Sequence, residues 1–398
     1  MIAKILDVLG SFGLVCALLL NLALLTFFGT LYQVDGGLYE AQKLYFESWY
    51  VVQRSPVPMV LPGGLFCMGM LAVNLFVGGL WRIRKSWRTA GVIVIHVGMS
   101  MLLASAFVKQ YHSEDGYLAL AEPVKDSRGN VIVPGEESDD FTSFHRIEVA
   151  LWDAAQKTEV AELLIPHEQL VDLGQGRART FTHPSLPFEL ELSGFVDNCR
   201  PMPKGPNWEA AGATVEGYAL LAMERDKENE KNFPGLTARF REPGGRAAEA
   251  LLSIFERYPA TFEAGGKTWA VSLRRQRYQM PFTIRLEDFR KEDHPGMSMA
   301  RAFESDVVKL QGGREEKKLI QMNDPLRSEG LVLFQSSFGE DEAGRPYSQF
   351  SVVRNPSDHW PEYSTWVIGW GMALAFLPRL WRFARSQRGA RGSKEVPA

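Results

Sequence analysis

Uncharged apolar stretches lie near both ends of this chain, and a polar, charged region lies between them. An α-helix needs about 20 apolar residues to cross the hydrocarbon of a bilayer, and four stretches reach or approach that length. Pro378 interrupts the last of them. We therefore predict an α-helical transmembrane bundle of four helices, over residues 8–33, 59–81, 89–108 and 363–381.

Lys and Arg are concentrated in the link between the second and third spans, residues 82–88, and in the tail, residues 382–398. Such segments stay on the cytoplasmic side, so the loop 34–58 and the large region 109–362 are expected outside the cytoplasm. The loop mixes acidic and aromatic residues and is expected to lie along the outer membrane surface. No transit peptide precedes the first span, which favours a bacterial cytoplasmic (inner) membrane over a thylakoid.

The outer region 109–362 differs from the spans. Short alternating, β-branched or aromatic runs are separated by clusters of Gly, Pro and Asp, a pattern typical of antiparallel strands. The runs cover residues 146–152, 160–166, 188–196, 217–223, 251–258, 269–278, 282–289, 331–338 and 347–356. We predict a large β-rich extracytoplasmic domain, either a sandwich or an open barrel.

Composition argues against several classes of function. The formal net charge of the 398 residues is −3, and no basic stripe is interleaved with aromatic residues, so we expect no binding of nucleic acid. The chain has three cysteines and no CxxC motif, which argues against a thiol–disulfide oxidoreductase. Only Cys199 lies in the polar region, where a lone cysteine is more often inert than reactive.

A single titratable residue, His96, lies inside the third predicted span. Ionisable residues in membranes usually face the bundle interior and mark a functional site. Three interpretations stay open from the residues alone: an interhelical hydrogen bond, a ligand to a cofactor such as haem, and a proton relay. Small residues at positions 91, 98, 100 and 104 allow close helix packing in each case. The chain has no Cys/His cluster at zinc spacing, which argues against a zinc site.

Several segments resemble blocks of the ResB-type cytochrome c biogenesis proteins. They are GTLYQVDGGLYEAQKLYFESWYV (29–51), GVIVIHVGMSMLLASAFV (91–108), EDHPGMSMARAFESDVVKL (292–310) and IQMNDPLRSEGLVLFQSSF (320–338). The order of parts is also similar: three helices, a large outer domain and one further helix. Residues 120–280 show no motif of the family.

This resemblance implies a subunit of the system II pathway that works with a CcsA-like multi-span partner carrying a Trp-rich motif. Such a pair moves haem b to the outer face of the membrane and presents it for covalent attachment to apocytochrome c. The resemblance also implies that His96 is an axial haem ligand, paired with a histidine of the partner. This chain lacks the partner's motif, so we expect it not to be a complete enzyme on its own.

Two questions stay open at this point. His359, just before the fourth span, is a second candidate for contact with haem, although an interfacial histidine beside Trp360 also serves as an anchor. The alternative function is a non-catalytic membrane scaffold whose β-domain docks apocytochromes or partner proteins without binding haem. A scaffold tolerates loss of the His96 imidazole, whereas a haem-binding subunit does not.

Overall fold

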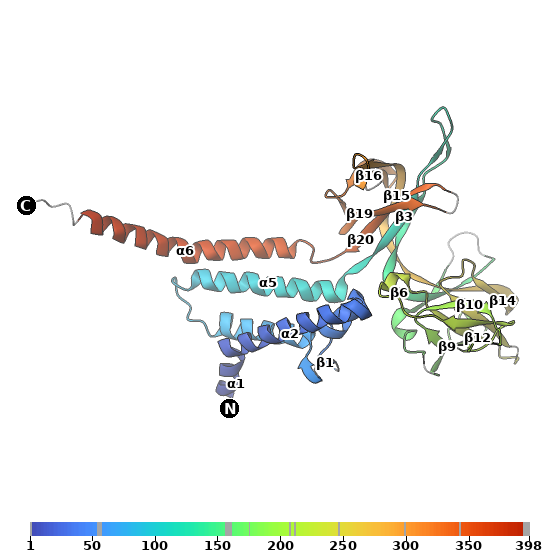
Figure 1. The fold of residues 1–398 in the computed structure, drawn as a ribbon, viewed down its shortest axis with the longest axis horizontal. Helices are drawn as coiled ribbons and strands as arrows, with labels where there is room; N and C mark the ends of the chain where they lie inside the picture. The colour runs from blue at the N-terminus through green and yellow to red at the C-terminus, as the bar shows by residue number, and fades with distance from the viewer. Residues whose placement is uncertain are drawn as a thin grey trace, which may run out of the picture. The chain divides into compact units, whose positions relative to one another are not determined.

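The computed structural model describes residues 2–53, 58–155, 161–174, 176–206, 208–210, 212–245, 247–297, 300–341 and 344–392. The chain divides into two compact units, Met1–Ser113 with Asn355–Ala398, and Glu114–Arg354. The first unit is mostly helical and the second is built mostly from strands (Figure 1). Parts of the predicted loop 34–58 and of the tail 382–398, at 54–57 and 393–398, lie outside the described residues.

Helices dominate the first unit. They are α1 (Ile2–Leu9), α2 (Phe12–Gly36), α3 (Leu38–Ala41), α4 (Gly64–Asn74), α5 (Ala90–His112) and α6 (Trp360–Gly392), with π-helical segments at Gln42–Phe46 and Leu75–Trp81. Within the described ranges, three helices are long and apolar enough to cross a membrane: Phe12–Gly36, Gly64–Trp81 and Ala90–His112. The three apolar helices near the N-terminus agree with the prediction. The helix α6 is not among the three, so the fourth span stays a prediction.

The first predicted span is interrupted at Gly10 and Ser11, between α1 and α2. Ser11 caps α2 by accepting a hydrogen bond from the Leu14 N–H at 3.2 Å. The side-chain amide of Asn74, which ends α4, donates to the carbonyl oxygens of Leu9 at 2.6 Å and Ser11 at 3.0 Å. Backbone groups freed by a break need partners in hydrocarbon, so Asn74 is the residue that makes this break tolerable.

The predicted second span, 59–81, begins too early: its helix starts at Gly64. Residues Met59–Pro62 form β2, which pairs with β1 (Tyr50–Gln53) in an antiparallel hairpin. The residue before a proline favours an extended backbone, so Pro62 delays the start of the helix. Asn21 on α2 donates to the Pro62 carbonyl at 2.8 Å and provides the partner that this end of the hairpin needs.

The helices α5 and α6 pack antiparallel and backbone against backbone (Figure 1). A β-carbon at Gly91 would lie 2.5 Å from the Ala375 nitrogen, and one at Gly371 would lie 2.7 Å from the Ile95 nitrogen. The helices approach this closely because glycine has no side chain, as at many membrane helix interfaces. Gly98, like Gly91 among the small residues named from the sequence, also contacts α6.

We predict that Gly371→Ala lowers the midpoint of thermal unfolding in detergent, at a cost of about 1–3 kcal/mol, because the new methyl group meets backbone atoms of α5 that cannot rotate away. Gly369→Ala is the matched control, since a β-carbon there meets nothing within 4 Å. It should leave the midpoint unchanged or raise it slightly, because alanine favours helix over glycine. Equal effects of the two substitutions would contradict this packing.

Strands build the second unit, and neighbouring strands within its sheets run antiparallel. The largest sheet has the order β17-β16-β15-β6-β3-β20-β19-β18. Its strands are β3 (Glu114–Ala121), β6 (Glu137–Asp153), β15 (Lys267–Asp293), β16 (Ala300–Gln311), β17 (Arg314–Gln321), β18 (Leu326–Ser328), β19 (Leu331–Glu340) and β20 (Pro346–Arg354), with β7 (Leu163–Pro166) on β6 and β14 (Ala260–Ala264) on β15.

Smaller pieces complete this unit. A second sheet has the order β13-β12-β9-β8, and β10 pairs with β11 as β4 does with β5. These strands are β4 (Val124–Lys125), β5 (Val131–Val133), β8 (Ala178–Phe181), β9 (Glu189–Val196), β10 (Cys199–Pro203), β11 (Tyr218–Ala222), β12 (Gly235–Arg241) and β13 (Ala247–Ser253). Short 3₁₀ turns lie at His167–Gln169 and Asn229–Lys231.

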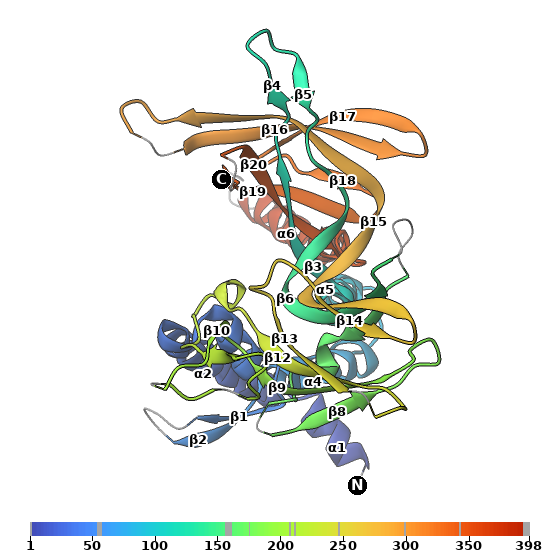
Figure 2. The same ribbon diagram turned by 90° about the vertical axis from the view of Figure 1, so that its right-hand side faces the viewer.

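The long strands β6 and β15 run through both halves of this unit (Figure 2). At one end they share a buried cluster with the second sheet, in which Val149 and Val271 pack with Leu190. At the other end Leu286 belongs to a second cluster, together with Phe350. The two apolar cores are therefore joined by continuous backbone, which couples them mechanically.

The largest sheet curls so that strands distant in its order meet. Ser305 on β16 donates to Gln335 on β19 at 2.7 Å and lies 2.8 Å from the hydroxyl of Ser348 on β20. All three residues are buried, and each is hydrogen-bonded within the cluster. The β-rich region agrees with the prediction, whereas the choice between a sandwich and an open barrel stays a prediction.

Candidate functional site

His96 is held on α5 by a hydrogen bond to its own helix. Its Nδ1 lies 2.7 Å from the carbonyl oxygen of Val92, one turn earlier. A carbonyl oxygen only accepts hydrogen bonds, so Nδ1 carries the proton in the neutral ring and Nε2 carries the lone pair. Among the described residues Nε2 has no hydrogen-bond partner. The geometry therefore leaves one nitrogen of a half-buried imidazole available as a ligand.

The ring of His96 packs against the π-helical segment Leu75–Trp81. A β-carbon at Gly79 would lie 2.1 Å from Cδ2 and 2.9 Å from Nε2 of His96. The imidazole thus lies against bare backbone. Gly91, Ile95 and Gly98 of α5 instead contact α6, so α5 uses separate faces for the two neighbours. Isolated π-helical turns occur frequently at functional sites.

His359 lies in a different environment, in the turn before α6. Its side chain is 60% exposed, with Nδ1 3.7 Å from the Glu362 carboxylate and Nε2 4.0 Å from that of Asp358. The ring stacks on Tyr363, with centroids 6.2 Å apart. Both nitrogens thus have carboxylates close by, as in a surface anchor.

The structure does not bring His96 and His359 together. Gly371 on α6 packs against Ile95, the neighbour of His96, and Gly371 follows His359 by twelve positions in the chain. At about 1.5 Å per helical residue that separation is roughly 18 Å along the axis. The two histidines are therefore too far apart to bind one iron atom from opposite sides. Among the described residues, no group of three or more His, Cys, Asp or Glu is placed to hold a metal ion.

Cys199, the cysteine of the strand unit, is fully buried at the start of β10. Burial raises the pKa of its thiol to about 11, although a hydrogen bond with Ser253 acts in the opposite direction. The thiolate is the reactive form, so this cysteine is protected from chemistry at neutral pH. The geometry agrees with the inert interpretation and removes Cys199 from the candidate sites.

We expect Cys199 of the folded protein to react with an alkylating reagent near neutral pH at least about 100-fold more slowly than an exposed cysteine introduced by Thr182→Cys. Digestion and mass spectrometry report alkylation at each position separately. In denaturant the two sites should react at similar rates. Fast alkylation of Cys199 in the native state would show that β10 opens or that the thiol is activated.

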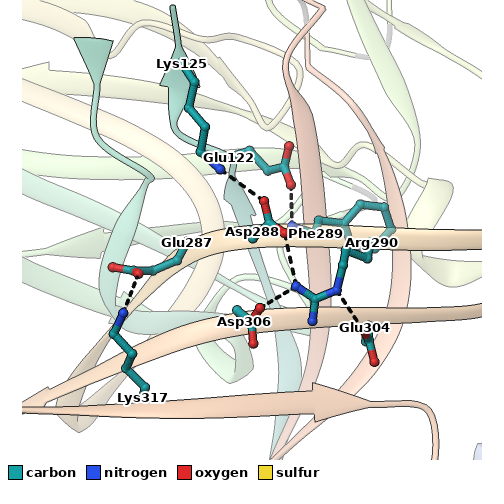
Figure 3. Close-up of polar contacts among 9 residues, drawn as sticks. All are labelled: Glu122, Lys125, Glu287, Asp288, Phe289, Arg290, Glu304, Asp306 and Lys317. Carbon is teal, nitrogen blue, oxygen red and sulfur yellow. Dashed lines mark hydrogen bonds and ion pairs between the residues drawn. The ribbon is translucent and has the colours of Figure 1, made fainter. Parts of the chain in front are cut away.

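A charged network lies on β15 and β16 (Figure 3). At its centre, the Arg290 guanidinium donates to Glu304 at 2.7 Å, to Asp306 at 2.5 Å and to Asp288 at 3.1 Å. Lys125, on β4, binds the other oxygen of Asp288 at 3.1 Å. These side chains are about two-fifths exposed, so each pair contributes little to stability and the network mainly fixes which strand segments lie together.

Glu122, beside this network, carries a perturbed carboxyl group. Its carboxylate accepts a hydrogen bond from the Phe289 N–H (Figure 3). Burial raises the pKa of Glu122 and the charge of Asp288 adds to this, whereas the bond from Phe289 and the charge of Lys125 lower it. A raised pKa means that the folded state holds this proton more tightly than the unfolded chain does. Stability from this group is therefore present at low pH and is lost as the pH rises through the ordinary glutamate value and up to the raised one.

Glu122→Gln keeps an oxygen for the Phe289 N–H and removes the charge. We predict that it stabilises the protein at about pH 7, by on the order of a few tenths of a kcal/mol because the group is partly exposed, and has little effect at about pH 4. Thermal unfolding of both proteins at the two pH values measures this. A larger gain at the lower pH would contradict the assigned direction of the pKa.

Two features escaped the sequence reasoning. Gly79 was not among the small residues named there, although the pair of glycines in LFVGGLW was a signal for close backbone contact. The acids around Arg290 alternate along β16, at positions 304 and 306, but nothing in the sequence indicated which cation they face.

In a comparison with known protein families, residues 255–362 match the ResB-like family. Comparison with curated proteins gives no match. The matched segment contains β14 to β20, the Arg290 network and His359. His96 lies outside it, so the match by itself assigns no role to that residue.

Proposed function

We propose that the chain, whose residues 255–362 match the ResB-like family, is a member of that family and a subunit of a system II cytochrome c biogenesis complex. The family indicates a role in cytochrome c biogenesis, and the apolar helices indicate a membrane protein. In the proposed role the chain helps to move haem b and to present it at the outer face of the membrane for attachment to apocytochrome c. The observation that carries the haem proposal is the free Nε2 of His96.

The donor set fits one axial bond to haem iron. Imidazole is a common axial ligand. A ligating histidine usually donates its other N–H to a carbonyl or carboxylate, which fixes the tautomer and the ring orientation. The bond from His96 Nδ1 to Val92 O has this form and leaves Nε2 for iron. When bound, haem would be the group that becomes attached to the apocytochrome.

The residues around His96 favour an apolar ligand of this kind. The helix α5 is built from Val, Ile, Leu and Met around the histidine, which keeps water away from the ring. Val92 holds the ring in place through its carbonyl, and α5 carries both residues as one rigid unit.

The second axial ligand is proposed to come from another chain, a CcsA-like multi-span partner with a Trp-rich motif. His96 is the only histidine in the apolar part of the predicted spans of this sequence. The basic segments at 82–88 and 382–398 support an extracytoplasmic position for the strand unit, in a bacterial cytoplasmic membrane. The proposed complex, rather than this chain alone, carries out the attachment of haem.

We predict that His96→Ala lowers the haem content of the purified complex with the partner by at least about tenfold. Added imidazole should restore haem to His96→Gly, because it replaces the missing ligand. His112→Ala is the matched control: His112 is exposed at the outer end of the same helix and should not change haem content. His359→Ala should also keep haem, because carboxylates lie near both of its nitrogens.

Haem content is measured by absorbance and by extraction, per mole of complex. An unchanged content and spectrum in His96→Ala would contradict the haem proposal and favour the alternative, a non-catalytic membrane scaffold. In that case the hydrogen bond to Val92 serves packing alone, and the strand unit, with its docking surfaces for apocytochrome or other proteins, becomes the functional part.

A further inference from the structure

The imidazole of His96 occupies space that exists because residue 79 is glycine. A β-carbon at position 79 would lie 2.1 Å from Cδ2, 2.8 Å from Cγ and 2.9 Å from Nε2 of His96. These separations are far shorter than van der Waals contact, so small shifts do not relieve them. With any other residue at position 79, either the ring or the π-helical backbone has to move.

The backbone around Gly79 is held from its other side. Gly78 lies against the break in the first helix, where a β-carbon at 78 would be 2.9 Å from the Gly10 carbonyl oxygen. At the two ends of the π-helical segment, Asn74 is hydrogen-bonded to the backbone of the break and Arg82 pairs with Asp7. These contacts fix the segment between them. The ring of His96 is therefore the part that yields.

A displaced His96 ring loses both its fixed tautomer and the fixed position of its Nε2 lone pair. The Nδ1 proton is bound to the Val92 carbonyl at 2.7 Å, and rotation of the ring away from position 79 breaks this bond. The tautomer is then no longer fixed by the helix. The free lone pair leaves its present position as well, since Nε2 is one of the three atoms that a β-carbon at 79 approaches.

We propose that Gly79 is a positioning residue for His96. Its missing side chain admits the imidazole in the one orientation in which Nδ1 donates to Val92 and Nε2 is left for a metal. The ligand chemistry in this inference rests on the proposed haem function, whereas the packing between Gly79 and His96 does not. Adjacent glycines thus serve two purposes, Gly78 for the approach of the first helix and Gly79 for the histidine.

The test compares Gly79→Ala with Gly69→Ala in the full chain, purified with its partner. Gly69 is on α4, and a β-carbon there meets nothing within 4 Å. Gly79→Ala is expected to lower haem content about 10-fold to 100-fold, the range for loss of a residue that orients a metal ligand, and to shift the absorption bands and midpoint potential of any haem that remains. Gly69→Ala is expected to change none of these.

A second measurement separates this inference from the haem proposal. Thermal unfolding is recorded for Gly79→Ala in the natural chain and in His96→Ala. The substitution should lower the midpoint when the imidazole is present and should lower it much less when the imidazole is gone, because the overlapping atoms are then absent. If the Gly79→Ala protein does not accumulate, the double variant with His96→Ala should accumulate again. That recovery would support the inference in the same way as the unfolding midpoints.

Equal destabilisation by Gly79→Ala in the natural chain and in His96→Ala would overturn the inference. It would also be overturned if His96→Ala loses haem while the Gly79→Ala complex keeps the natural haem content, spectrum and midpoint potential. If His96→Ala keeps its haem, the haem proposal fails, and the unfolding comparison alone decides whether Gly79 positions the ring.

Discussion

Hydrocarbon offers the backbone no hydrogen-bond partner, and this constraint accounts for the polar side chains inside the apolar helices. Asn74 donates to two carbonyls at the break between α1 and α2, and Asn21 donates to the carbonyl of Pro62 beside the start of α4. Each amide supplies a donor where regular helix does not. His96 differs, because the Val92 carbonyl uses only one of its two nitrogens. The second nitrogen has no structural use among the described residues, which is why a functional role is the better explanation.

Close contact between helix backbones is the second determinant of the helical unit. The pairs Gly10 with Gly78 and Gly91 with α6 bring main chains together with almost no side-chain volume between them. Apolar side chains are not driven together in lipid as they are in water, so such contacts supply the packing energy instead. They also set distances that side chains cannot adjust. The position of the His96 ring therefore depends on glycines in a helix that precedes it in the chain.

Sequence patterns predicted what depends on local composition and missed what depends on distant contacts. The apolar helices followed from length, and several of the strands followed from alternation, since both reflect the immediate surroundings of each residue. The strands β12, β16 and β17 lie in none of the predicted runs. The break at Gly10 was missed because its partner, Asn74, is 63 residues or more away from the carbonyls that it binds. The runs 269–278 and 282–289 were read as separate, yet both lie in β15, where the pairing with β6 shifts between Gln279 and Ile284. His96 was recognised because it is a titratable residue in an apolar span. The orientation of its ring could not be predicted, because it depends on packing against the π-helical segment Leu75–Trp81.

The positions of His96 and His359 bear on whether a haem site would lie within this chain or be shared with a partner chain. One imidazole, that of His96, lies in the apolar region, and His359 lies roughly 18 Å away along the axis of α6, beside carboxylates. A six-coordinate haem iron needs two axial ligands, so under the proposed function this chain would supply one of them. Under the proposed haem function, a single ligand from this chain favours release, because relative movement of the two chains then separates the two ligands. In the proposed function, a site shared between two chains suits a haem that is passed on to an apocytochrome.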